Sequence, residues 1–346
     1  MELAHRVVVH EVEHPARLLV DRKGISTPDE LCQFLTGAQF PGIAALCHQL
    51  FPTDAIPYRS LSSMEDANHI SPFIVGPPIQ CPQKFFGRDT QLKRIFGLVS
   101  HFPLQHIAII GPRRSGKTSL LHYLRMITTT ASVRLRPGQK HGWLRHPDAY
   151  RWVYVDFQDA RMHNQEALLR HILKGLELPV PDECSLTNFL STVSEHLVLP
   201  SIILIDELER AFRARGLEQE VLWESLRSLA SNSTDGRLGL IAASKEFPQN
   251  LQSQVRLSSS PFLNIFGHTV QLGPFTRDEA RALIDSSPRP FSPEDIDWIM
   301  AQSQGWPVLL QALCLTRLNT IDESGDAWKD EALVQILPYQ HLLKRA

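Results

Sequence analysis

The sequence has no apolar stretch close to the length of a membrane-spanning helix, and its longest apolar stretches lie around 107–110 and 202–205. The first residues are interrupted by charges and lack the apolar region of a signal peptide. The five cysteines form no CxxC pair, which disfavours a zinc site or a disulfide framework. The GxSxG motif is absent, so a serine hydrolase is not predicted. We expect a cytoplasmic protein without a membrane partner.

Charge of one sign is not in excess either. The 346 residues include 35 Lys and Arg against 37 Asp and Glu, a net charge of −2. No overall positive charge therefore drives nonspecific nucleic-acid binding, although a local patch can still do so. The chain is about twice as long as a usual domain, and its composition, 43% apolar and 21% charged, is that of a globular protein. We expect two or three domains.

The amino-terminal part of the sequence predicts a small module followed by a linker. A helix start is expected at Thr27, with Pro28 in the first helical position. Proline and serine are frequent between residues 51 and 82, and proline is incompatible with a central strand or a helix interior. The predicted parts of the chain are a small interaction module over 1–55, a proline-rich linker over 56–82, a core domain over 83–275 and a helical domain over 276–346.

Short apolar runs alternate with longer helical segments between residues 84 and 275. The runs are rich in Ile, Val and Leu without polar alternation, which is typical of strands buried on both faces of a parallel sheet. The segments between them are long enough for right-handed crossover helices, so we predict a doubly wound α/β domain with a five-stranded parallel sheet. The predicted strands are 106–110, 152–156, 202–206, 238–243 and 268–272.

Helices are predicted after residue 275. Thr276 is the expected N-cap of one helix, with Glu279 as its capping-box partner. Ser292 followed by Pro293 predicts the start of a second helix.

The strongest motif is the segment 111–118, GPRRSGKT, which matches GxxxxGK[ST] between a predicted strand and a predicted helix. Its glycines allow the backbone to wrap a phosphate, and the helix N-terminus directs partial positive charge toward it. Lys117 is expected to reach the β- and γ-phosphates of ATP, and the Thr118 hydroxyl to hold Mg²⁺. The residues expected to bind the nucleotide here are Gly111, Pro112, Arg113, Arg114, Ser115, Gly116, Lys117, Thr118 and Ser119.

Two acidic residues, Asp206 and Glu207, follow the third predicted strand. In a doubly wound sheet the carboxyl ends of the strands line the ligand crevice. Asp206 is therefore expected to join the magnesium shell, and Glu207 to orient and deprotonate the attacking water. An acidic pair after a strand can also be a plain helix N-cap, but its place after a P-loop favours the catalytic role.

The order of the motifs resembles the STAND branch of the AAA-related P-loop ATPases, and within that branch the archaeal-type and bacterial ATPases of the MNS group. The motifs are FFGRD, GPRRSGKTSLL, IILIDELER, LIAASK and QGWP, and they extend over about 80–310. The resemblance implies that Phe86, Gly87 and Arg88 cradle the adenine and ribose. Ordinary core packing is the alternative for Phe85, Phe86 and Trp306.

The resemblance also implies a C-terminal helical lid and a sensor for the γ-phosphate. Pro307, in the GWP segment, corresponds to a proline that packs near the nucleotide base. Lys245 stands where such ATPases often carry a sensing arginine, and a lysine supplies charge without the bidentate fork of arginine. Ser244 is the polar alternative at the same strand end.

Arg256 and the basic segment 133–152 each allow two interpretations. Arg256 is our candidate for an arginine finger that acts on a neighbouring subunit, with a solvated surface arginine as the alternative. The segment 133–152 carries five basic residues against one acid, interleaved with Trp143 and Tyr150, a pattern that suits a nucleic-acid backbone and base stacking. A solvated loop is the simpler interpretation of this segment.

Three classes of function fit these observations. The first and favoured one is an ATP-hydrolysing molecular switch whose ATP or ADP state controls self-association and a protein effector partner. The second is a nucleic-acid-associated AAA ATPase, such as a transposition or origin-recognition-like regulator. The third is a scaffold that binds nucleotide without hydrolysis, and the intact P-loop and acidic pair disfavour it.

Overall fold

The computed structural model describes residues 71–345 apart from 218–219, 248–249, 251–260 and 324. The predicted module over 1–55, the helix start at Thr27 and most of the predicted linker lie outside the described residues, and so does Arg256. The described residues belong to one compact unit that begins at residue 70.

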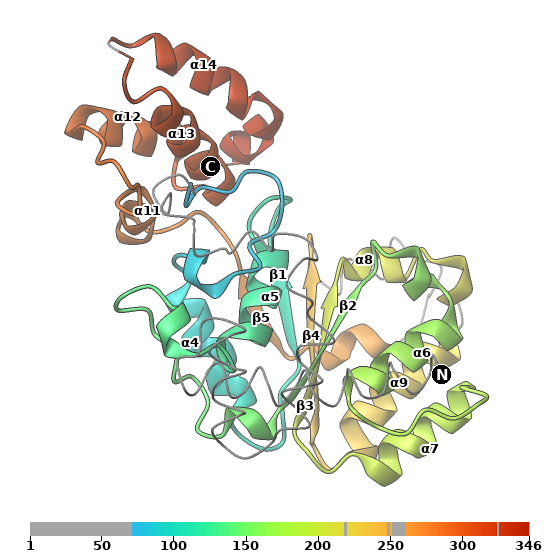
Figure 1. Ribbon diagram of the computed structural model, residues 1–346. Coiled ribbons are helices and arrows are strands. Elements are labelled where there is room, and N and C mark those ends of the chain that lie inside the picture. Colours follow the sequence, from blue (N-terminus) through green and yellow to red (C-terminus); the bar gives the residue numbers. More distant parts are fainter. Residues whose placement is uncertain (1–70, 218–219, 248–249, 251–260, 324, 346) are drawn as a thin grey trace, which may run out of the picture. The chain divides into compact units, whose positions relative to one another are not determined.

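A parallel five-stranded sheet forms the centre of the α/β domain (Figure 1). Its strands are β1 (Ile107–Ile110), β2 (Arg151–Asp156), β3 (Ser201–Asp206), β4 (Leu238–Ser244) and β5 (His268–Gln271). They lie in the order β2-β3-β4-β1-β5, and every neighbouring pair is parallel. The predicted doubly wound P-loop NTPase fold is therefore confirmed, and each predicted strand is present within a residue or two.

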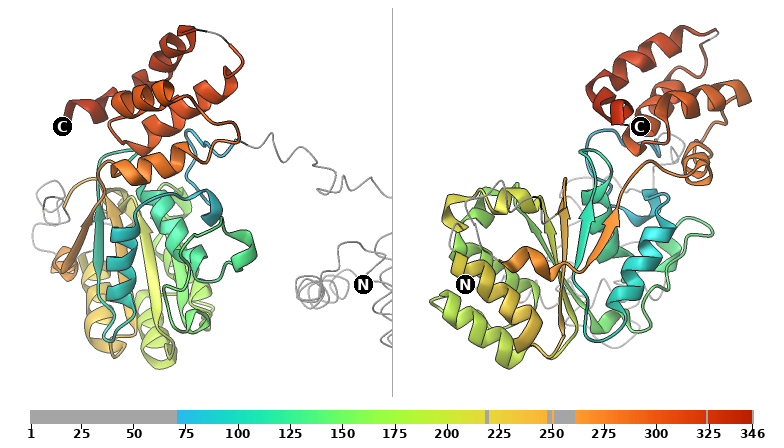
Figure 2. Two further views of the ribbon diagram at one scale, coloured as in Figure 1. Left: turned by 90° about the vertical axis from the view of Figure 1, so that its left-hand side faces the viewer. Right: turned by 180° about the vertical axis from the view of Figure 1, so that it is seen from behind.

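Helices cover both faces of the sheet, and each face has its own apolar core (Figures 1 and 2). Helices α4 (Asp89–Val99) and α5 (Lys117–Ile127) pack on one face. Helices α6 (Gln165–Gly175), α7 (Leu186–His196) and α9 (Glu220–Ser228) pack on the other. Because successive strand residues point to opposite faces, Ile109 and Ile110 enter different cores.

Short helices and turns connect these elements. Helix α8 (Leu208–Ala211) follows β3 directly. The remaining short elements are η3 (Pro82–Lys84), η4 (Ser132–Arg134), η5 (Pro147–Ala149), η6 (Ala160–His163), η7 (Arg215–Leu217), η8 (Leu229–Ser233) and η9 (Pro261–Ile265).

The chain after β5 is helical, and these helices enclose a third apolar core. They are α11 (Arg277–Ile284), α12 (Pro293–Ser303), α13 (Pro307–Asn319), α14 (Ala327–Ile336) and η10 (Leu337–Arg345). Thr276 and Glu279 form the predicted capping box of α11, and Ser292 caps α12 with Pro293 in its first turn. We call these helices the helical domain.

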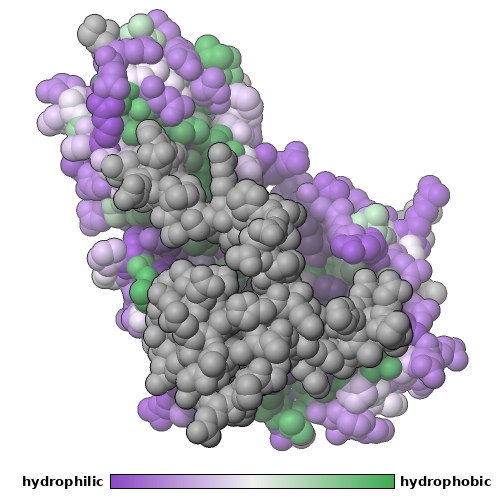
Figure 3. All heavy atoms as spheres, viewed as in Figure 1, coloured by the Kyte–Doolittle hydropathy of each residue, from purple (hydrophilic) through white to green (hydrophobic). Residues whose placement is uncertain are grey.

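Hydrophilic residues cover most of the described surface in view in Figure 3. Among the described residues, no helix is both long and apolar enough to cross a membrane. The three cysteines that the structure describes, Cys81, Cys184 and Cys314, are free thiols. The same residues contain no group of three or more His, Cys, Asp or Glu side chains placed to hold a metal by themselves.

Candidate functional site

The segment 111–116 forms a tight loop between β1 and α5, and its backbone explains its glycines. Arg114 and Gly116 both have left-handed backbone conformations, with φ of 68° and 94°. A Cβ on Gly111 would lie 2.7 Å from the Leu272 carbonyl oxygen and 2.7 Å from Ser115 Oγ. Glycine is therefore required at 111 for space, and it is favoured at 116 for its backbone conformation.

Lys117 is the buried cation of this loop, with only 7% of its surface exposed. Its ammonium group donates to the backbone carbonyls of Gly111 at 2.9 Å and Pro112 at 3.1 Å. Burial lowers its pKa, while the nearby carboxylates of Glu207, Glu209 and Asp206 oppose that shift. A bound anion at this loop would therefore find a cation that is already desolvated and held in place.

Three helix N-termini without a side-chain cap contribute residues to the surroundings of this loop. The N-cap residues of α5, α8 and α13 are Gly116, Glu207 and Trp306, and none of them accepts a capping hydrogen bond through a side chain. Side chains do cap the N-termini of α6, α7, α11 and α12. Uncapped amides and the helix dipole favour an anionic ligand, as a phosphate-binding loop requires.

Asp206 is held at the carboxyl end of β3 by two side chains from neighbouring elements. It is 1% exposed, and it interacts through side-chain hydrogen bonds with Thr118 and Tyr154. The Tyr154 hydroxyl donates to Asp206 Oδ2 at 3.0 Å. Burial raises the pKa of Asp206, and the two hydrogen bonds act against that shift. The predicted metal ligands Thr118 and Asp206 thus lie side by side.

Glu207 is half-buried and begins the turn into α8 with a left-handed φ of 53°. Its backbone N–H donates to Asp206 Oδ1 at 3.0 Å, and Arg210 Nε lies 3.8 Å from its carboxylate. Burial and the neighbouring Glu209 charge raise the pKa of Glu207. A carboxylate with a raised pKa is a better proton acceptor near neutral pH than an ordinary surface glutamate.

Lys245 and Ser244, the predicted γ-phosphate sensors, lie where β4 ends. Lys245 Nζ lies 3.4 Å from Glu209 Oε1, whose side chain is only 7% exposed. Ser244 is 1% exposed, and its hydroxyl accepts the Glu246 N–H at 3.3 Å. Lys245, the predicted sensor, is therefore paired with Glu209, a buried acid for which the sequence predicted no role.

The segment 73–80 runs between the helical domain and α5, and we call it the strap. The Ile74 N–H donates to Gln311 Oε1 of α13 at 2.9 Å, and the Ile79 N–H donates to Ser119 Oγ at 3.0 Å. Arg114 donates to the Gly76 carbonyl, and its guanidinium also lies 5.9 Å from the Tyr339 ring centre.

The loop, the strap and the helical domain enclose a cleft of about 540 Å³, which we call the phosphate cleft. Ligand pockets commonly have volumes of this order. The lining of the cleft includes Gly116, Lys117, Thr118, Tyr154, Asp156, Glu207, Pro307 and Gln311. The cleft therefore combines the backbone amides of the loop, the cations Arg113, Arg114 and Lys117, a candidate metal ligand and a candidate base.

A smaller cavity of about 50 Å³ shares part of this lining. Three of the residues predicted to surround adenine and ribose line it together, namely Phe86, Arg88 and Pro307. The guanidinium of Arg88, however, is bonded to the backbone carbonyls of Ser115 and Gly273. Gly87 has a left-handed φ of 68° and packs closely on Phe275 and Glu279. Phe85, Phe86 and Trp306 are all buried in apolar cores.

The basic segment 133–152 is folded against the α/β domain. Trp143 stacks on Phe96 of α4 at 5.2 Å, and the Tyr150 hydroxyl donates to the Val99 carbonyl. Arg151 pairs with Glu177 at 2.8 Å. The two aromatic side chains that could stack on bases thus pack against α4.

Comparison with protein families gives one match over this region. Residues 102–251 match the model of the family described as "AAA domain". The match includes the loop, the acidic pair and the end of β4. None of the curated proteins matches the chain.

Solved structures with the same fold include two archaeal proteins. A Walker-type ATPase of Pyrococcus abyssi is 17% identical with a TM-score of 0.51, and the alignment covers 78% of each chain. The ORC2 protein of Aeropyrum pernix is 15% identical with a TM-score of 0.52, over 75% of this chain and 69% of that one. At these identities the likeness extends to the fold, a P-loop NTPase α/β fold.

Several residues of the cleft were not found from the sequence. Tyr154 and Asp156 lie on β2, where a polar or aromatic residue at a strand end carries no motif. The strap and Gln311 carry no motif either. Glu209, which pairs with Lys245 outside the cleft lining, had a local signal, since it lies two residues after the predicted base.

Proposed function

We propose that the protein binds ATP with Mg²⁺ in the phosphate cleft and hydrolyses it. One observation carries this proposal: Lys117, the Thr118–Asp206 pair and Glu207 meet at the uncapped N-terminus of α5. The match to an AAA domain over the same residues supports it. ATP and ADP are the expected ligands, and P-loop NTPases use this combination of groups for phosphoryl transfer.

Different residues of the cleft suit metal binding, phosphate binding and activation of water. Thr118 and Asp206 offer the oxygen ligands that Mg²⁺ prefers, and bound Mg²⁺ supplies neutralising charge at the phosphates. Lys117 would exchange its two carbonyl partners for phosphate oxygens. Glu207 would orient the attacking water and accept its proton.

Phosphate release from MgATP by the full chain tests hydrolysis, with Glu207→Gln as the key variant. Glutamine keeps the size and hydrogen bonding of the side chain but accepts no proton, so we expect turnover to fall by about 10²–10⁴ with ATP binding retained. Glu209→Gln is the matched control, because it neutralises a buried carboxylate two residues away. A larger loss in Glu209→Gln than in Glu207→Gln would overturn the base assignment.

We further propose that the ATP or ADP state reorients the helical domain, as in a molecular switch of the STAND type. Pro307, Val308 and Gln311 of α13 line the cleft, which supports this coupling. The expected readouts are self-association and binding of a protein effector. Sedimentation in apo, ADP and nonhydrolysable-ATP conditions tests the first, and identical particle sizes in all three would contradict it.

Arg256 is proposed as the residue that completes a neighbour's site. Mixing Arg256→Ala with Glu207→Gln chains should restore hydrolysis, because one supplies the base and the other the arginine. If the mixture is as inactive as its two components, Arg256 does not act on a neighbouring chain.

The first 80 residues are proposed to form a separable interaction module and its linker. They contain five Lys and Arg against nine Asp and Glu, a balance opposite to that of 133–152. Limited proteolysis between about residues 51 and 71 should leave a fragment that binds ATP. Resistance over that span would favour one integrated domain.

Nucleic-acid association remains the second proposal, and the described contacts do not favour 133–152 as its surface. Trp143 and Tyr150 are packed, and Arg136 donates to the Phe85 carbonyl at 2.6 Å. Repeating the sedimentation experiment with duplex DNA tests it. ATP-dependent co-sedimentation with DNA would favour this second function over a protein-directed switch.

A further inference from the structure

The segment 85–88 is anchored in two apolar cores at once. Phe85 stacks on Tyr123 with ring centres 4.2 Å apart, in the core between α4, α5 and the sheet. Its neighbour Phe86 packs in the core of the helical domain. This segment is therefore one of the chain's connections between the two cores.

Arg88 lies two residues after Phe86, and its side chain contacts both the loop and the connection to the helical domain. It is 3% exposed, and its Nη2 donates to the Gly273 carbonyl at 2.6 Å and to the Ser115 carbonyl at 3.1 Å. Its guanidinium lies 4.7 Å from the ring centre of Phe275. Burial lowers the Arg88 pKa to about 10, so the group remains charged at neutral pH. Gly273 and Phe275 belong to the connection between β5 and α11.

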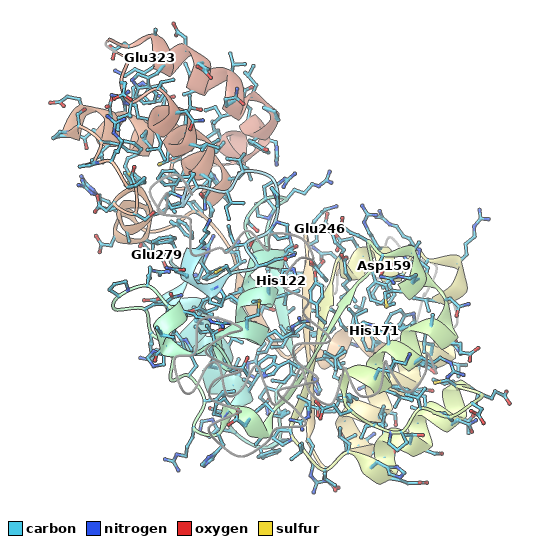
Figure 4. The ribbon with its side chains drawn as sticks, viewed as in Figure 1. His122, Asp159, His171, Glu246, Glu279 and Glu323 are labelled. Carbon is cyan, nitrogen blue, oxygen red and sulfur yellow. The ribbon has the colours of Figure 1, made fainter. Side chains whose placement is uncertain are left out.

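The backbone of Arg88 is tied to the start of α11 as well. Its N–H donates to Oε1 of Glu279, whose Oε2 accepts the N–H of the α11 N-cap Thr276 at 2.9 Å. One carboxylate thus caps α11 and holds Arg88. Glu279 is labelled in Figure 4 at the end of the helical domain nearest the α/β domain. A Cβ on Gly87 would lie 3.1 Å from Glu279, so the close approach depends on glycine there.

On the other side, Arg88 holds the phosphate-binding loop by the Ser115 carbonyl. In a planar trans peptide the C=O and the following N–H point in opposite directions. Fixing the Ser115 carbonyl toward Arg88 therefore fixes the direction of the Gly116 N–H, and Gly116 lines the phosphate cleft. The Ser115 hydroxyl is buried and has no hydrogen-bond partner among the described residues. The bond from Arg88 to its carbonyl, at 3.1 Å, is complemented by a longer bond from the Ser115 N–H to the Pro112 carbonyl, at 3.3 Å.

We propose that Arg88 is a positioning residue that couples the orientation of the phosphate-binding loop to helix α11 of the helical domain. This inference rests on the proposed binding of ATP. A nucleotide that engages the Gly116 N–H acts on the Ser115–Gly116 peptide, and Arg88 transmits the change to Gly273, Phe275 and the α11 capping box. The coupling is reciprocal, so a partner that moves α11 changes the affinity for nucleotide by the same factor.

Amide hydrogen exchange on the full chain, with and without a nonhydrolysable MgATP analogue, tests the coupling. In the wild type we expect nucleotide to slow exchange both at 111–119 and at 277–284, the latter by at least about fivefold. In Arg88→Met, nucleotide should still slow exchange at 111–119. At 277–284, the exchange rates with and without nucleotide should differ by less than about twofold. Analogue affinity should fall in the same variant, by roughly the coupling factor of five or more.

Arg136→Met is the matched control. Arg136 is a half-buried arginine that, like Arg88, donates to two backbone carbonyls, those of Gln83 and Phe85, and lies 4.1 Å from the Phe86 ring centre. None of these partners belongs to the phosphate-binding loop or to α11. We expect comparable destabilisation in Arg136→Met with the nucleotide response at 277–284 preserved.

Arg88→Lys keeps the charge but reaches only one carbonyl well, so it should retain an intermediate response and serves if Arg88→Met does not fold. An unchanged response in Arg88→Met, an equal loss in Arg136→Met, or no response at 277–284 in a wild type that binds the analogue would each overturn the coupling. Absence of analogue binding to the wild type would instead contradict the proposed function.

Discussion

The two ends of the sheet both bury titratable side chains, but they give them different surroundings. At the amino end, His106 precedes β1, and its Nδ1 accepts the Leu240 N–H at 3.1 Å. Burial lowers its pKa to about 4, so its ring is neutral at ordinary pH. At the carboxyl end, Lys117 and Asp206 are buried with Glu207 beside them, in or beside a cleft.

This difference separates a stabilising role from a functional one. A neutral imidazole that accepts a backbone N–H satisfies the hydrogen-bonding capacity of that strand and needs no ligand. Charged groups are costly to bury, and their clustering next to a cleft is typical of a functional site. We therefore expect substitutions at the carboxyl end to affect nucleotide binding and substitutions at the amino end to affect stability.

The largest effect is expected at the carboxyl end, for Lys117→Ala. The change removes a desolvated cation that would make charge-assisted bonds to phosphate, so ATP affinity should fall by about 100-fold or more. Thermal stability should change little by comparison, because the lost partners are two backbone carbonyls. Calorimetry with ATP and a thermal melt of the same sample measure both quantities, and a variant that binds ATP normally would contradict the P-loop assignment.

At the amino end, His106→Asn should alter stability but not nucleotide binding. The folded-state pKa of about 4 lies below the ordinary 6.5, so the unfolded chain binds the proton first as the pH falls. Stability from this group is present above pH 6.5 and is lost between pH 6.5 and 4, by up to about 3 kcal/mol. Denaturant unfolding at several pH values should show that the free energy of unfolding falls less steeply with acid in the variant. If it falls equally steeply in both proteins, groups other than His106 govern the acid dependence.

A smaller effect is expected for Tyr154→Phe, which removes the hydroxyl that donates to Asp206. Groups that orient a metal ligand typically affect metal affinity by about 10–100-fold. The Mg²⁺ concentration for half-maximal turnover should rise accordingly, while ATP binding without Mg²⁺ stays unchanged. His171→Gln serves as the control, because that side chain contacts the Tyr154 carbonyl and not its hydroxyl. An equal rise in both variants would assign the effect to strand β2 as a whole.

The smallest effect is expected for Gln311→Ala, which releases the strap from α13 at Ile74. One neutral hydrogen bond contributes about 1 kcal/mol, so ATP affinity should change by roughly fivefold. Comparing ATP with GTP would reveal whether the strap also contributes to base selection. Equal changes for both nucleotides would limit Gln311 to a positional role.

The sequence predicted the carboxyl end of the sheet well because its signals are local. The strand runs, the capping box at Thr276, the N-cap at Ser292 and the loop at 111–118 each depend on residues that are close in the chain. Backbone conformation and helix capping follow directly from such short-range patterns.

The rest of the site depends on contacts between distant residues. Ile74 meets Gln311 across 237 positions, and Arg88 meets Gly273 across 185. Such contacts follow from tertiary packing and leave no periodic or motif signal in one sequence. The pairing of Lys245 with Glu209 was missed for the same reason, since it joins β4 to the turn after β3.

The central claim is that the carboxyl end of the sheet binds ATP mainly through its phosphates. Calorimetric titration of the full chain with MgATP, ADP, AMP and adenosine measures this most directly. We expect MgATP to bind at least about 100-fold more tightly than AMP or adenosine, and Lys117→Ala to remove most of that difference. Equal affinity for AMP and MgATP, or an unchanged preference in Lys117→Ala, would contradict it.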